Sequence, residues 1–268
     1  MTSPTSHPFG DRPDPPPVYG MGTLSHDVVK AELVQPGRPD PGERISILYL
    51  MVWTAGSALI LTFFRQTLDQ PTAPNNPPWL QAITALLISP LQGAGVAALG
   101  LAIWRKLKLG RPFPVQPGHR LLVIGGIMAI VSWPLYLTVH SFFPHGLAFY
   151  LAFYRLPLLV LFCVITSIAL SQMKGEERWQ GMFLLWIGGN ILGFLVVSSA
   201  VGGAMSFRWA AAEMYIVAAM NLAFLIPAIL DVRTGCKRDQ LHRFGVACRV
   251  ANIGMFVISL IRMFLPTR

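Results

Sequence analysis

Charged residues are scarce in this chain. They make up 12% of its 268 residues, whereas soluble domains carry about 25%. Hydrophobic residues make up 53%, and they are gathered into long runs instead of alternating with polar residues as in a soluble core. The scarcity of charge therefore excludes an ordinary soluble protein, and it predicts that lipid surrounds most of the chain.

Residues that would support a recognisable chemistry are also few. Cys163, Cys236 and Cys248 are an odd number of cysteines without the spacing of metal ligands, so we expect neither a disulfide nor a metal site. The sequence has no HExxH, P-loop or G-x-S-x-G motif. Its last apolar segment has no lysine for a retinal Schiff base, and His140 lacks a second histidine at matching depth for haem. We therefore expect no cofactor, and an enzyme is the less favoured interpretation.

The first 43 residues contain nine prolines and few large apolar side chains. Such a segment cannot bury enough surface to offset the entropy that is lost on ordering. We predict a disordered Pro-rich cytoplasmic tail over residues 1–43 and a transmembrane helical domain over residues 44–268. Within the tail, Pro16 to Tyr19 match the PPxY pattern that WW domains bind, although a proline-rich tail readily produces this match by chance.

Seven apolar segments follow the tail. Each has about 20 to 26 residues, which at 1.5 Å per helical residue matches or slightly exceeds a hydrocarbon core of about 30 Å. They do not show the alternation of apolar and polar residues that barrel strands require. The predicted fold class is an all-α integral membrane protein, a polytopic bundle of about seven transmembrane helices. The predicted spans are 45–64, 79–104, 121–143, 147–170, 181–204, 209–230 and 244–265.

The distribution of Lys and Arg predicts the orientation of these spans. Fifteen of them fall on one side of the seven-span arrangement and three on the other. Because basic loops stay in the cytoplasm, we expect a cytoplasmic N-terminus, an external C-terminus and a location in the plasma (inner) membrane. The same bias explains the net charge of +9 without nucleic acid. Only three residues join spans 121–143 and 147–170, so a five-span arrangement is an alternative.

Prolines and glycines within the spans predict where helices bend and where they pack closely. Proline removes a backbone hydrogen bond and bends a helix, and a GxxxG pattern permits close helix contact. We expect the glycine contacts either within the chain or with a second copy or another subunit of a membrane complex. The prolines are Pro90, Pro134, Pro157 and Pro227, the GxxxG pair is Gly189 and Gly193, and a looser pair is Gly125 and Ala129.

Glu213 is the only acidic residue inside any predicted span. A charge inside the bilayer is costly without a partner. We expect Glu213 to pair with Arg155 or Arg262, which lie at similar depth, and His140 and His145 to line the same outward-facing pocket. The alternative is that both arginines extend to the outer headgroups and that Glu213 marks the water boundary.

A second set of polar residues is predicted nearer the inner side. On the last span, Arg249, Asn252 and Ser259 fall within about 80° of one another at 100° per residue, so they form a polar stripe. With Asn190 and Asn221 this stripe predicts either an interhelical hydrogen-bond seam or a transport path. In the seam interpretation, Arg249 reaches the cytoplasmic headgroups or Asp231.

Three functions fit these features. Bent helices with asparagines at several depths favour a small-molecule transporter or carrier. Short loops, glycine faces and the lack of a catalytic motif favour a structural or accessory subunit of a membrane complex. A membrane-embedded enzyme or sensor would use the outer cluster around Glu213 and His140. All three share the lipid bilayer as the main partner.

Overall fold

The computed structural model describes residues 47–68, 78–110, 114–142, 150–199, 207–254, 257–258 and 261. All of them belong to one compact unit, Pro41–Arg268. The predicted tail over residues 1–43, with its PPxY match, lies outside the described residues, as do His145, Ser259 and Arg262. These expectations stay predictions.

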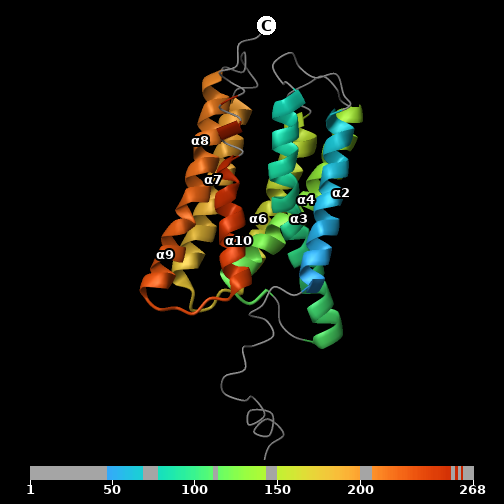
Figure 1. Ribbon diagram of the computed structural model, residues 1–268. Helices are drawn as coiled ribbons and strands as arrows, with labels where there is room; N and C mark the ends of the chain where they lie inside the picture. The colour runs from blue at the N-terminus through green and yellow to red at the C-terminus, as the bar shows by residue number, and fades with distance from the viewer. Residues whose placement is uncertain are drawn as a thin grey trace, which may run out of the picture. The chain divides into compact units, whose positions relative to one another are not determined.

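The described secondary structure is entirely helical. In Figure 1 the helices lie side by side, with α2, α3 and α4 packed in sequence and α7 packed against α8. A short π-helix, η1, runs directly into α6. The helices are α2 (Ile47–Leu68), α3 (Pro78–Leu109), α4 (Pro117–Phe142), η1 (Leu151–Arg155), α6 (Leu156–Ser171), α7 (Glu177–Ser199), α8 (Phe207–Ala223), α9 (Leu225–Arg233) and α10 (Gln240–Ala251).

Among the described residues, six helical segments are long and apolar enough to cross a membrane. The predicted fold class, an all-α polytopic membrane bundle, is confirmed. The predicted seventh span begins within α10, and part of its second half lies outside the described residues, so the number seven stays a prediction. The six segments are Ile47–Arg65, Trp79–Lys108, Pro117–Phe142, Leu151–Ser171, Glu177–Ser199 and Ala212–Arg233.

Two of the prolines coincide with interruptions of regular α-helix. The ring of Pro157 would clash with the carbonyl of Phe153 in an α-helix, and the backbone there adopts the wider π-helix η1. Pro227 stands in the same relation to Ala223, where α8 ends before α9 begins. Pro90 and Pro134, by contrast, lie inside continuous α3 and α4.

An aromatic cluster fills the space between α6, α7 and the junction of α8 with α9. The Trp186 ring meets Phe162 edge to face at 4.7 Å and Phe224 at 5.5 Å between centroids. Phe183 is fully buried beside them and meets Phe224 at 6.0 Å. Edge-to-face contacts of this kind stabilise a core beyond the burial of apolar area. Through Phe162, the cluster also forms part of the wall of a cavity between the helices.

Candidate functional site

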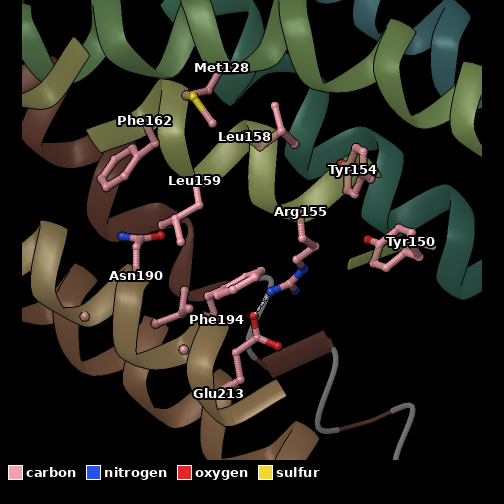
Figure 2. A pocket seen from close by; sticks show the side chains of 13 residues that line it. Met128, Tyr150, Tyr154, Arg155, Leu158, Leu159, Phe162, Asn190, Phe194 and Glu213 are labelled. Carbon is pink, nitrogen blue, oxygen red and sulfur yellow. Dashed lines mark hydrogen bonds and ion pairs between the residues drawn. The ribbon is translucent and has the colours of Figure 1, made fainter. Parts of the chain in front are cut away.

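A cavity of about 320 Å³ lies between α4, η1, α6, α7 and α8. We call it the outer cavity, because the sequence predicts that it lies toward the outer side of the membrane. Figure 2 shows that Arg155 and Glu213 meet at one side of it, with Asn190 and Phe162 further along. Its remaining lining side chains are mainly aliphatic and aromatic. The outer cavity therefore combines one charged pair with an apolar wall.

Arg155 Nη1 donates a hydrogen bond to Glu213 Oε1 and forms an ion pair with it. The Arg155 side chain is 32% exposed and that of Glu213 is 17% exposed. The phenol of Tyr150 also interacts with the guanidinium. Both charges are thus held at the cavity and stay partly accessible from it. Arg262, the other expected partner of Glu213, lies outside the described residues.

Local sequence places each member of the pair. Arg155 is the last residue of η1, so the π turn before Pro157 determines the direction in which its side chain leaves the helix. On the facing helix, Gly193 has no side chain, and a Cβ built there would lie 3.5 Å from Glu213 Cγ. A Cβ at Gly189 would lie 2.6 Å from Met220 Cγ. The GxxxG pair of α7 is therefore in contact with α8 of the same chain.

Aromatic residues connect His140 to the wall of the outer cavity. Tyr150 and Tyr154 line it, with ring centroids 4.9 Å apart. Tyr154 contacts Tyr136 at 5.7 Å, and His140 stacks in parallel on Tyr136 at 5.6 Å. His140 is thus one ring removed from the cavity lining.

The residues of the expected inner seam are placed separately. Asn190 lines the outer cavity and donates to the carbonyl of Trp186 at 2.8 Å, while Asn252 donates to the carbonyl of Cys248 at 3.0 Å. Both bonds lie within one helix, so they do not join helices as a seam would. Asn221 is 1% exposed, and its Oδ1 has no hydrogen-bond partner among the described residues.

Arg249 also differs from expectation. Its guanidinium carbon lies 4.2 Å from the centre of the Trp186 ring, a cation–π contact, and it does not reach Asp231. Asp231 Oδ2 instead accepts hydrogen bonds from Trp179 and Arg238. Helix rotation, which the sequence pattern does not define, turns Arg249 toward α7. The other alternative, that Arg249 reaches the cytoplasmic headgroups, stays a prediction.

A polar network that the sequence did not predict joins the helix ends on the opposite side of the bundle. Arg238 donates to both carboxylate oxygens of Glu176 at 2.7 Å and through Nε to Asp231 at 2.8 Å. These bonds raise the pKa of Arg238, chiefly through Glu176. Glu176 lies in the short turn before α7, yet it accepts this bidentate bond from a residue 62 positions away. No local signal identifies such a pair.

The same network continues from the start of α10 to the start of α4. Asp239 caps α10 by accepting from the His242 backbone N–H at 2.7 Å, and its Oδ1 lies 2.8 Å from His119 Nε2. Burial alone would raise the pKa of Asp239, but the bonds from His119 and His242 hold it below its ordinary value. The cap, an Asp before an apolar helix, is the one part of the network that a local sequence signal could have identified.

His242 is buried in this network as a hydrogen-bond acceptor. Its Nδ1 accepts from the Gly118 backbone N–H at 3.0 Å, so the ring is neutral with its proton on Nε2. Burial, together with the neighbouring positive charge of Arg238, lowers the pKa of His242 to about 4. His242 therefore stays neutral at physiological pH.

Within the described residues, no group of three His, Cys, Asp or Glu side chains could hold a metal ion. The outer cavity instead offers one cation, one carboxylate and one amide beside an apolar wall. No protein family, characterised protein or solved structure matches the chain.

Proposed function

We propose that this multi-pass membrane protein is a carrier for a small amphipathic solute, which binds in the outer cavity. The observation that carries the proposal is the Arg155–Glu213 ion pair at a cavity with an apolar wall. Charged side chains inside membrane helices commonly mark substrate pathways. A volume of about 320 Å³ lies at the small end of the range for ligand pockets.

The pair suits a solute that carries charge. Taking two charges out of water is costly, and mutual attraction offsets this cost only in part. A solute carboxylate competing for Arg155, or an amine competing for Glu213, would therefore exchange one ion pair for another at a small net cost. The apolar part of the solute would pack against Leu159 and Phe162.

Two interruptions of regular helix favour a binding site that can move. The π turn η1 carries Arg155, and the junction between α8 and α9 lies within three turns of Glu213. Helices bend at such places more easily than within regular α-helix. A second cavity, of about 390 Å³, lies by Trp179 and Arg238 near the start of α7. A carrier of this design would alternate between the two ends, with the N-terminus in the cytoplasm and the plasma membrane as its location.

The accessory-subunit interpretation has less support. Gly189 and Gly193 were its expected contact surface, and both glycines contact α8 of the same chain. A second copy or a partner using this surface would have to displace α8. The enzyme or sensor interpretation uses the same outer cluster, so the experiment below also bears on it.

The experiment is a thermal-shift screen of the purified chain with apolar amino acids, short fatty acids and alkylamines, followed by uptake into proteoliposomes. We expect one class to stabilise the protein and to be taken up. Glu213→Gln should abolish both effects for an amine solute and should strengthen the binding of a carboxylate solute, which no longer competes with Glu213 for Arg155. Lys108→Gln removes an exposed charge at the end of α3, outside both cavities, and should leave binding and uptake unchanged. If no class binds, or if both variants behave alike, the proposal is wrong. Chemical conversion of the bound solute would favour an enzyme.

A further inference from the structure

A groove of about 280 Å³ lies between α4 and α6, away from the outer cavity. Its lining residues recur every three or four positions on each helix, so the groove runs along the helix axes. Seven residues of helix correspond to a length of about 10 Å. The residues that define it are Arg120, Val123 and Ile127 on α4, and Ile165, Ile168 and Gln172 on or just after α6.

One end of the groove is cationic. Arg120 is 5% exposed, and its Nη1 and Nη2 donate to the carbonyls of Ala169 at 2.6 Å and Gln172 at 2.9 Å. Its Nε is buried without a hydrogen-bond partner among the described residues. Glu176 is a nearby acid, and both of its carboxylate oxygens accept from Arg238. A guanidinium donor is thus left over at the groove.

The other end of the groove is apolar and lies deeper in the membrane. Arg120 belongs to the first turn of the membrane helix Pro117–Phe142. Because these 26 residues are longer than a hydrocarbon core of about 30 Å requires, we expect the first turn at the level of the lipid headgroups. Ile127 and Ile165 lie about 10 Å further along, within a hydrocarbon leaflet about 15 Å thick. The groove therefore passes from headgroup level into the acyl-chain region, with a cation at the headgroup end.

We propose that this groove is a binding site for one anionic phospholipid. An acyl chain lies between Val123 and Ile168, and a phosphate oxygen accepts a hydrogen bond from Arg120 Nε. Basic sites between helices on the cytoplasmic side suit anionic headgroups, and Lys174, exposed two residues after Gln172, adds a second positive charge. The proposal is independent of the carrier function, since none of these residues lines the outer cavity.

Native mass spectrometry of the full chain tests the site, using an equimolar mixture of phosphatidylglycerol and phosphatidylcholine with identical acyl chains. We expect one retained lipid, with phosphatidylglycerol preferred several-fold. Ile168→Trp fills the groove and should abolish retention. Ile191→Trp is the matched control, because Ile191 is likewise exposed but lies on α7 outside the groove. Equal loss in both variants would show that the lipid does not occupy the groove.

A second variant tests the headgroup contact. Arg120→Lys keeps the positive charge but removes the Nε donor and the planar fork that fits phosphate. We expect the preference for phosphatidylglycerol to fall at least fivefold. An unchanged preference in this variant, or equal retention of the two lipids by the unmodified chain, would overturn the proposal. If Arg120→Lys does not fold, the two tryptophan variants and the unmodified chain still decide it.

Discussion

Trp179 Nε1 donates a 2.9 Å hydrogen bond to Asp231 Oδ2, and so joins the start of α7 to the end of α9. Arg238 Nε donates to the same oxygen at 2.8 Å. One carboxylate oxygen therefore joins the end of α9 and the loop that follows it to the start of α7, 52 positions away. This relationship makes the polar network around Arg238 a stabilising element of the bundle, with consequences that can be measured.

Replacing Arg238 should destabilise the protein. Arg238→Gln leaves Glu176 and Asp231 without their cation. We expect a loss of about 2–3 kcal/mol, below the range of about 3–5 kcal/mol for a fully buried pair because Glu176 is 31% exposed. Thermal or SDS-induced unfolding in mild detergent measures the change. Arg178→Gln, at an exposed position of α7 near the network, is the control and should change stability little. Equal effects of the two substitutions would contradict the structural role of Arg238.

Stability should fall as the pH is lowered from about 6.5 to about 4. The pKa of His242 is about 4 in the folded protein, below the value of about 6.5 expected when unfolded. Across this window the unfolded chain binds a proton that the folded chain does not, so unfolding becomes more favourable by up to about 3 kcal/mol. Unfolding midpoints measured between pH 4 and 8 give the slope.

His242→Asn provides the control for this pH dependence. Its Oδ1 can take the place of Nδ1 and accept from the Gly118 N–H, but it does not titrate. The slope between pH 6.5 and 4 should flatten. A further loss below pH 4 should remain, because Asp239 has a lowered pKa and its bonds are lost as it becomes protonated. An unchanged slope in the variant would assign the pH dependence to another group.

Adding a methyl group at Gly126 should weaken the contact between α3 and α4. A Cβ there would lie 2.2 Å from the carbonyl oxygen of Gly95, so the helices would have to move apart. We expect Gly126→Ala to cost about 1–3 kcal/mol in unfolding experiments. Gly125→Ala is a neighbouring control, because a Cβ at Gly125 meets no atom within 4 Å. Should both variants unfold alike, close packing at Gly126 is not what limits stability.

These glycines show what pattern reasoning could and could not identify. The pair Gly125 and Ala129 was the expected close contact, and Ala129 is indeed 2% exposed. The tight approach, however, is made by Gly126 against Gly95 of α3. Adjacent residues differ by about 100° around a helix, and spacing alone does not say which of them faces the neighbour.

In the candidate site, too, the sequence identifies some of the residues and not others. Charge rarity within the spans was enough to single out Arg155 and Glu213, which meet at the outer cavity. Arg120 and Arg238 are two of the fifteen basic residues on one side of the predicted spans, and their spacing indicates no partner. Both are bonded to groups about 50 to 60 positions away. Contacts over such separations leave no local pattern, because they depend on how whole helices pack.

Hydropathy and segment length establish the helices and the membrane environment, since lipid acts on each apolar segment separately and requires its backbone to be hydrogen-bonded internally. Packing between segments determines which helix faces meet. It also forms the cavity that α6, α7 and α8 border and the network around Arg238. Lipid is as apolar as leucine, so hydrophobicity cannot choose among helix rotations, and that choice rests on close packing and on a few polar bonds between helices.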